Sequence, residues 1–148
     1  MRRLTVFLCV FCLACKKEEP YTPQQLSPVP AIELISVNPA SVRQLTDTLV
    51  FVISYTDGDG DLGDYHADSL SLWITDLRFP LTIRYHIPPL APAETSIPIT
   101  GELRAVLSGI ILKDEQATSE QAVFTIRLKD RAGHWSNEVF SPPIVILP

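Results

Sequence analysis

Apolar and polar residues alternate with a period of two through most of the chain beyond residue 30. Between Leu49 and Tyr55 the odd-numbered positions are apolar, and later segments repeat the pattern: Leu70–Ile74, Leu81–Ile87 and Ala122–Leu128. Neighbouring side chains of an extended strand point to opposite faces, so the alternation predicts β-strands with one buried face.

Two further strands are expected to be interrupted or restricted by glycine and proline. The apolar stretch Ile97–Leu107 contains Gly101, which predicts a bend or bulge at that residue. Ile144 and Ile146 indicate a short last strand directly after Pro142-Pro143. Because proline cannot donate a hydrogen bond to a neighbouring strand, we expect this last strand at the edge of a sheet.

No segment carries the 3.6-residue period of an amphipathic helix. The best candidate, Lys113–Gln121, is polar and is expected to be a loop or a single turn. About seven short strands in residues 31–148 predict an all-β fold, namely an antiparallel immunoglobulin-like β-sandwich. The buried faces are expected to include Phe51, Ile53, Phe124 and Ile126.

The chain begins with a segment that is unlike the rest. Two arginines precede an apolar run from Leu4 to Leu13, which is shorter than the roughly 20 residues that a membrane-spanning helix needs. A positive start followed by a short apolar run is typical of a signal peptide, here residues 1–14. Residues 15–30 carry four prolines and few apolar side chains, which favours an extended tether between this segment and the domain.

The junction between leader and tether resembles a bacterial lipoprotein signal. Ala14 precedes Cys15, and charged residues begin at once with Lys16. The resemblance implies lipidation of Cys15, cleavage before it, and anchoring of the protein in the outer membrane, since Lys16 replaces the aspartate that retains such proteins in the inner membrane. The string from Cys15 to Glu19 also resembles the export signal of Bacteroidetes surface lipoproteins. The alternative is an ordinary secretory leader with a chance cysteine.

Aspartate and glycine alternate directly after the strand Leu49–Tyr55. Asp57, Asp59 and Asp61 are separated by Gly58 and Gly60, and glycine allows the tight turn that would bring the carboxylates around one centre. Calcium prefers six to eight such oxygen ligands, and without a cation the carboxylates would repel one another. This spacing therefore predicts a calcium site, and the lack of thiols after Cys15 favours calcium over zinc or copper.

Three other aspartates are candidates for completing the ligand shell. Asp64 and Asp68 follow in the same loop, and Asp130 opens the last hairpin, which in an immunoglobulin-like sandwich lies at the same end. The loop resembles an EF-hand loop in its first positions, but Leu62 stands where the EF-hand has glycine, and strands flank it. A solvated acidic turn and a pair of catalytic carboxylates are the alternative interpretations.

The closing hairpin resembles the turn that ends many bacterial immunoglobulin-like and fibronectin-III-like domains. Asp130, Ala132, Gly133 and Ser136 match that turn, and Gly133 is expected to have a positive φ. For Asp130 and Asn137 we expect hydrogen bonds to the backbone of the turn.

Taken together, these features resemble a set of small Bacteroidetes outer-membrane lipoproteins with a single domain of this kind. The resemblance rests on the lipoprotein cysteine, the tether, the string YTDGDGDLGD, Ile87-Pro88-Pro89 and KDRAGHWSNEV. It implies an architecture and a location, with the membrane as partner through the lipid anchor, but no chemistry.

Charge and motifs argue against several classes of function. A net charge of −5 without a cluster of basic residues argues against a nucleic-acid partner. The three histidines lack the spacing of a helical zinc site, and there is no Gly-x-Ser-x-Gly motif. We therefore expect a non-enzymatic, structural or partner-binding protein. The alternatives are a surface module that binds glycan or peptide and a small hydrolase.

The two tryptophans are expected to differ in role. Trp73 is expected to pack on its strand, whereas Trp135 is the candidate for a protein or glycan contact.

Overall fold

A computed structural model describes residues 26–79, 81–92 and 95–148. The expected signal peptide, Cys15 and most of the expected tether lie outside these residues. The described residues form ten strands: β1 (Ala31–Asn38), β2 (Ser41–Arg43), β3 (Leu49–Asp57), β4 (Leu70–Asp76), β5 (Leu81–His86), β6 (Ile99–Leu107), β7 (Glu120–Ala122), β8 (Phe124–Leu128), β9 (Val139–Phe140) and β10 (Ile144–Leu147).

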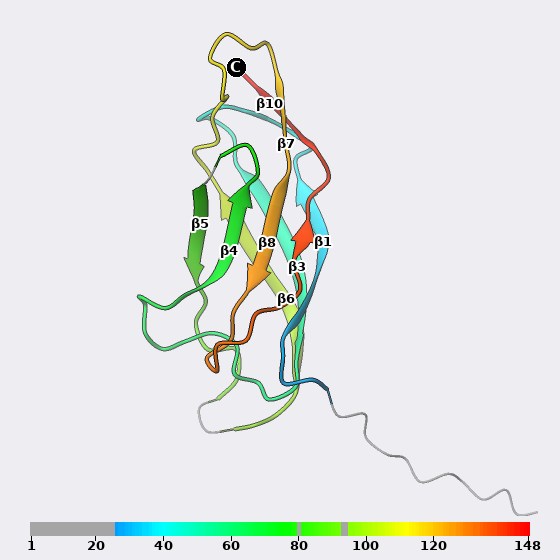
Figure 1. Ribbon diagram of the computed structural model, residues 1–148, viewed down its shortest axis with the longest axis vertical. Coiled ribbons are helices and arrows are strands. Elements are labelled where there is room, and N and C mark those ends of the chain that lie inside the picture. Colours follow the sequence, from blue (N-terminus) through cyan, green and yellow to red (C-terminus); the bar gives the residue numbers. More distant parts are fainter. Residues whose placement is uncertain (1–25, 80, 93–94) are drawn as a thin grey trace, which may run out of the picture.

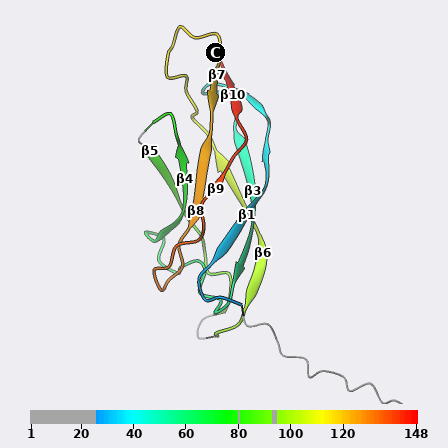
Figure 2. The same ribbon diagram turned by 45° about the vertical axis from the view of Figure 1, so that its right-hand side comes forward.

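The predicted all-β class is confirmed. The described residues contain no helix, and hence none that could cross a membrane. Most strand pairs are antiparallel, and the strands form two layers that face each other, as Figures 1 and 2 show from two directions. This arrangement is consistent with a β-sandwich.

One layer is the sheet β1-β3-β6, with β3 in the middle. β3 pairs with β6 along its whole length, from Leu49 opposite Leu107 to Asp57 opposite Ile99. Gly101 lies opposite Tyr55 within this regular ladder, so the bulge predicted at Gly101 is wrong. A side chain at this position would collide with the Tyr55 ring, so the glycine makes room for an aromatic side chain and does not bend the strand.

The other layer consists of the sheet β5-β4-β8-β9 and, beyond it, the small sheet β2-β10-β7. β10 pairs in parallel with β2 and antiparallel with β7, so the prediction that the last strand is an edge is wrong. The reason is that Pro142 and Pro143 precede Ile144, where the strand begins, and leave its own N–H groups free to pair. The expected strand Ala122–Leu128 is interrupted at Val123, which is one reason why the strands outnumber the expected seven.

The core lies between the two layers. Phe51 of β3 and Phe124 of β8 meet edge to face with ring centroids 5.6 Å apart. Ile53 and Ile126 are also fully buried, so the predicted burial of these four side chains is confirmed. Residues 113–119 of the polar segment Lys113–Gln121 form a loop with a turn, as the sequence predicted, and its last two residues begin β7.

Candidate functional site

The first carboxylate of the acidic loop belongs to a strand. β3 extends two residues beyond Tyr55, and its inward-facing positions alternate from Leu49 through Phe51, Ile53 and Tyr55 to Asp57. Asp57 is only 1% exposed. The strand period therefore places a carboxylate where an apolar side chain would be expected.

The backbone turns back on itself directly after Asp57. Gly60 and Gly63 have φ values of +72° and +79°, a region that glycine adopts without strain. Between them Leu62 is completely buried and belongs to the hydrophobic core. The residue that departs from the EF-hand pattern thus fixes the loop against the domain.

This turn brings three aspartates together. Asp57, Asp59 and Asp61 each offer a carboxylate oxygen within 4.8 Å of the others. Their Oδ1 atoms are shielded from solvent and have no hydrogen-bond partner in the described part of the chain. A buried carboxylate oxygen without a partner is costly, so three at one point indicate a site that could hold a metal ion.

The second oxygens of two of these carboxylates are held by the backbone. The Asp61 N–H donates to Asp57 Oδ2 at 2.9 Å, and the Ala132 N–H donates to Asp61 Oδ2 at 2.9 Å. These bonds fix the direction of each carboxylate and leave one oxygen of each free. The site is therefore preorganised on one side and unsatisfied on the other.

The electrostatics of the site disfavour negative charge in the absence of a cation. Burial, followed by the charges of Asp59 and Asp61, raises the pKa of Asp57 to about 6. The pKa of Asp61 is also raised, mainly by burial. A divalent cation would reverse this balance because it stabilises the ionised carboxylates.

The closing hairpin docks on the acidic loop. Leu62 and Asp130 form an isolated antiparallel bridge, and Arg131 Nη1 donates to the Gly63 carbonyl at 2.8 Å. Both segments lie at the end of the molecule opposite the labelled C-terminus (Figures 1 and 2). The expected proximity of loop and hairpin is thus present.

The other three predicted ligands are not part of the group of three. Asp64 Oδ1 accepts from the His66 N–H at 2.9 Å, which lowers the pKa of Asp64, and Asp68 is exposed. The buried Asp130 accepts from the His134 N–H at 2.7 Å, and its Oδ2 lies 2.9 Å from His134 Nδ1. The hairpin that Asp130 opens nevertheless reaches the site, because the Arg131 N–H donates to the Asp61 carbonyl at 3.3 Å and the charge of Asp130 contributes to the raised pKa of Asp61.

The hairpin otherwise follows expectation with one exception. Gly133 has a φ of +96°, and Asp130 binds the turn backbone as predicted. Asn137 does not bind the turn. Its amide and carbonyl groups instead bind the Ile32 backbone of β1, at 2.8 and 2.9 Å, and so tie the hairpin to the first strand.

The end of the expected tether also reaches the acidic loop. The Gly58 N–H donates to the Ser27 carbonyl at 2.8 Å, and a side chain at Gly58 would collide with the backbone of Leu26 and Ser27. Sequence reasoning missed this contact. The glycine between the first two aspartates was its only signal.

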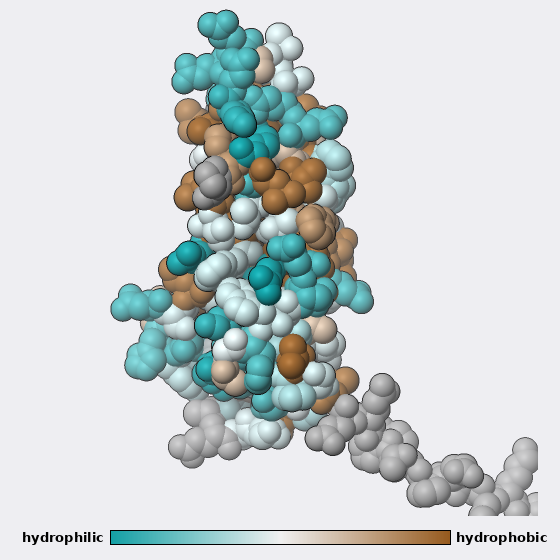
Figure 3. Space-filling view, viewed as in Figure 1, coloured by the Kyte–Doolittle hydropathy of each residue, from teal (hydrophilic) through white to brown (hydrophobic). Residues whose placement is uncertain are grey.

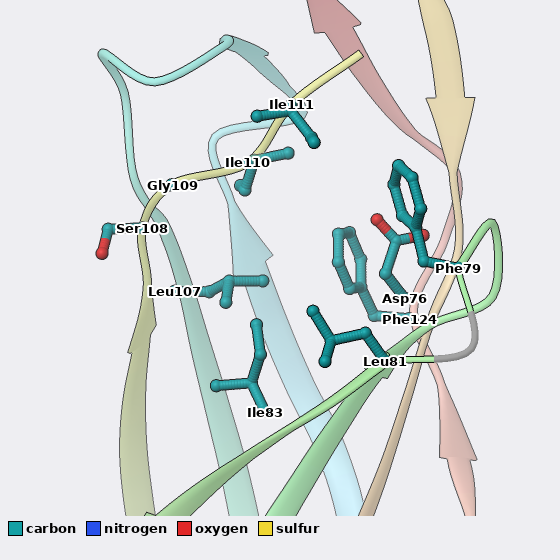
Figure 4. Close-up of a pocket in the computed structure, with 10 residues that line it drawn as sticks. All are labelled: Asp76, Phe79, Leu81, Ile83, Leu107, Ser108, Gly109, Ile110, Ile111 and Phe124. Atoms are coloured by element: carbon teal, nitrogen blue, oxygen red, sulfur yellow. The ribbon is translucent and has the colours of Figure 1, made fainter. Parts of the chain in front are cut away.

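An apolar pocket lies far from these carboxylates, between the end of the β4–β5 pair and the segment after β6. It encloses about 260 Å³, and Figure 4 shows Leu81, Ile83, Leu107 and Phe124 pointing into it. Its one carboxylate, Asp76, is paired with Arg78 at 2.8 Å. The pocket therefore offers no pair of free carboxylates for acid–base catalysis.

The two tryptophans lie together on the outer face of the second layer. Trp73 and Trp135 meet edge to face with centroids 4.6 Å apart. Trp135 pairs with Lys129 beside the sheet and does not project from the hairpin tip.

Comparisons with protein-family models, curated proteins and solved structures found no match to this chain.

Proposed function

We propose that this chain is a non-enzymatic cell-envelope domain of the immunoglobulin-like type, anchored in the outer membrane through Cys15 and stabilised by calcium. Its role is structural or partner-binding. The observation that carries the calcium proposal is the group of three buried Oδ1 atoms of Asp57, Asp59 and Asp61, which have no hydrogen-bond partner among the described residues.

The chemistry of these ligands favours calcium. All three are hard carboxylate oxygens, and no histidine or cysteine belongs to the group. Calcium accepts irregular sets of six to eight oxygens, whereas magnesium demands a near-ideal octahedron. Backbone carbonyls of the loop and water would supply the rest, and Asp64, Asp68 and Asp130 remain candidates.

The position of the site gives the ion a structural role. Asp57 ends β3, Asp61 is bonded to the closing hairpin through Ala132, and Gly58 is bonded to Ser27 of the expected tether. An ion bound by Asp57 and Asp61 would therefore hold together a core strand, the last hairpin and the point where the tether meets the domain. A calcium-bound domain would thus keep its shape next to its anchor.

Calorimetric titration tests the calcium proposal. We expect one calcium ion per chain, with heat released or absorbed on binding, and much weaker binding of magnesium under the same conditions. A titration without heat, together with no retention of calcium in equilibrium dialysis, would remove the site.

The alternative function, a surface module that binds a glycan or peptide, is favoured by a separate observation. Trp73 and Trp135 form a pair on the outer face of a sheet, where three basic side chains surround them. The apolar pocket gives the hydrolase hypothesis no comparable support, since its single carboxylate is paired with Arg78.

A further inference from the structure

The outer face of β5, β4 and β8 gathers basic side chains that are far apart in the sequence. Trp73 of β4 lies opposite Arg84 of β5 on one side and opposite Arg127 of β8 on the other. Lys129 follows on the same face as Arg127, two residues further along. Figure 3 shows this face from the front, with hydrophilic residues among residues of intermediate hydropathy across its middle.

The cations and the tryptophan rings form a continuous series of contacts. The guanidinium carbon of Arg84 lies 4.2 Å from the Trp73 ring centroid, and that of Arg127 lies 4.8 Å from the Trp135 ring centroid. Lys129 Nζ lies 5.7 Å from the same Trp135 ring. Cation–π contacts of this kind hold long side chains in place, so the positive charges are fixed in position before any ligand binds.

No carboxylate in the described part of the chain balances these charges. Among the described residues, the ion pairs within 4.0 Å involve Arg43, Arg78 and His134, but not Arg84, Arg127 or Lys129. The Nε atom of Arg127 is buried and has no hydrogen-bond acceptor there. Although the chain has a net charge of −5, three cations on one face thus have no ion-pair partner within the described ranges.

We propose that this face binds an acidic polysaccharide, that is, a sugar chain that carries carboxylate groups. The guanidinium fork matches a carboxylate in geometry and charge, and Arg84 and Arg127 are separated by two strand spacings, about 9.5 Å at the backbone. A chain with carboxylates on alternate sugars could reach both arginines.

The same geometry disfavours a protein partner. Protein interfaces depend on aromatic or apolar anchors that enter a pocket, and here each tryptophan ring is already engaged by the other ring and by a cation. What this face offers is polar and charged: the three cations and, one row along, the hydroxyls of Thr75 and Thr82, which bond each other at 2.8 Å.

This inference rests on the alternative function proposed above, a surface module for a glycan. It does not require the lipid anchor. Trp73 and Arg84 lie on β4 and β5, whereas Trp135 belongs to the closing hairpin, which is bonded to Asp61 through Ala132. The sugar is therefore titrated in saturating calcium, and the calcium site is tested separately by calorimetry.

The experiment uses tryptophan fluorescence of the full chain in a non-ionic detergent, titrated with a hyaluronan oligosaccharide, which carries a carboxylate on alternate sugars. The chain has only two tryptophans, and both belong to this face, so a bound ligand should change the emission directly. We expect saturable binding that weakens as salt is added. The affinity of the double variant Arg84→Gln/Lys129→Gln for the oligosaccharide should be at least about tenfold lower, because two charged contacts are lost.

Matched variants and probes make the result decisive. Arg104→Gln removes an exposed cation of β6 in the other layer and should leave the affinity unchanged. The proposal is overturned if hyaluronan does not bind, if Arg104→Gln weakens binding as much as the double variant, or if polyglutamate binds as tightly as the sugar.

Discussion

Asp57 is the residue whose position demands the most explanation. It is an ionisable side chain at the inward-facing end of a core strand. One oxygen is bonded to the Asp61 N–H, and the other has no partner among the residues that the structure describes. Leaving a buried carboxylate oxygen unpaired costs about 1–3 kcal/mol or more. Asp59 and Asp61 add two further orphan oxygens at the same point, which a bound cation would satisfy together.

A substitution at Asp59 tests this directly. Asp59→Asn keeps the size of the side chain but removes one charge, so the calcium affinity should fall by at least about tenfold in calorimetry, since charged oxygens dominate calcium binding. Glu102→Gln, which removes an exposed charge from β6, is the control and should bind calcium like the unaltered chain. Equal affinities of the Asp59 and Glu102 variants would contradict the site.

The raised pKa of Asp57 predicts a pH dependence. Calcium needs the ionised carboxylate, so protons compete with it below the pKa of about 6. The affinity should be about tenfold weaker at pH 5 than at pH 7.5 if one proton is displaced. In chelator, where no calcium binds, the free energy of unfolding depends on pH in the opposite direction. Protonated Asp57 stabilises the fold, and this stabilisation is lost as the pH rises from the unfolded pKa of 3.8 through the folded pKa of about 6. A calcium affinity that is the same at both pH values would contradict this assignment.

At this scale the sequence predicted the centre of the site but not its surroundings. The phased Asp57, Asp59 and Asp61 could be recognised because a tight turn converges side chains two residues apart. Leu62 is buried in the core, and the residues after it turn away from the three carboxylates. The positions of Asp64 and Asp68 could therefore not be predicted from their spacing in the sequence alone. The basic face could not be recognised either, because Arg84, Trp73 and Arg127 meet only when three strands pair.

At the scale of the strands, alternation predicted which segments extend but not how proline and glycine act within them. Pro142 and Pro143 precede β10 and leave its hydrogen bonds intact, so the strand lies between two neighbours. Gly101 provides space for Tyr55 in an unbroken ladder. Both misjudgements have one physical cause: the effect of these residues depends on the neighbouring strand, which the sequence does not reveal.

The core contact between the layers predicts a large loss of stability on truncation. Phe124→Ala removes a side chain that is 1% exposed and packs against Phe51, so unfolding in urea should show a loss of about 3–5 kcal/mol. Phe140→Ala is the matched control. Its side chain is 57% exposed on β9, so the change should be within about 0.5 kcal/mol. A loss below about 1 kcal/mol at Phe124 would place this residue outside the stabilising core.

At the scale of the whole molecule, the described chain begins at the end that carries the acidic loop. The Ser27 carbonyl accepts from the Gly58 N–H, and Cys15, the proposed anchor, stands twelve residues before Ser27 in the sequence. Cys15→Ser should release the protein from membranes and abolish labelling with a fatty-acid analogue, because lipidation requires the thiol. Unchanged membrane fractionation of this variant would contradict the anchor.

The most direct test of the account is thermal unfolding of the chain with calcium and with chelator. An ion that binds only the folded state stabilises it by about 2.7 kcal/mol at one hundred times the dissociation constant, which corresponds to a rise in melting temperature of about 10 °C for a domain of this size. We predict this rise with calcium, and its loss in the Asp59→Asn variant. Equal melting temperatures of the unaltered chain in saturating calcium and in chelator would contradict the proposal that calcium stabilises this fold.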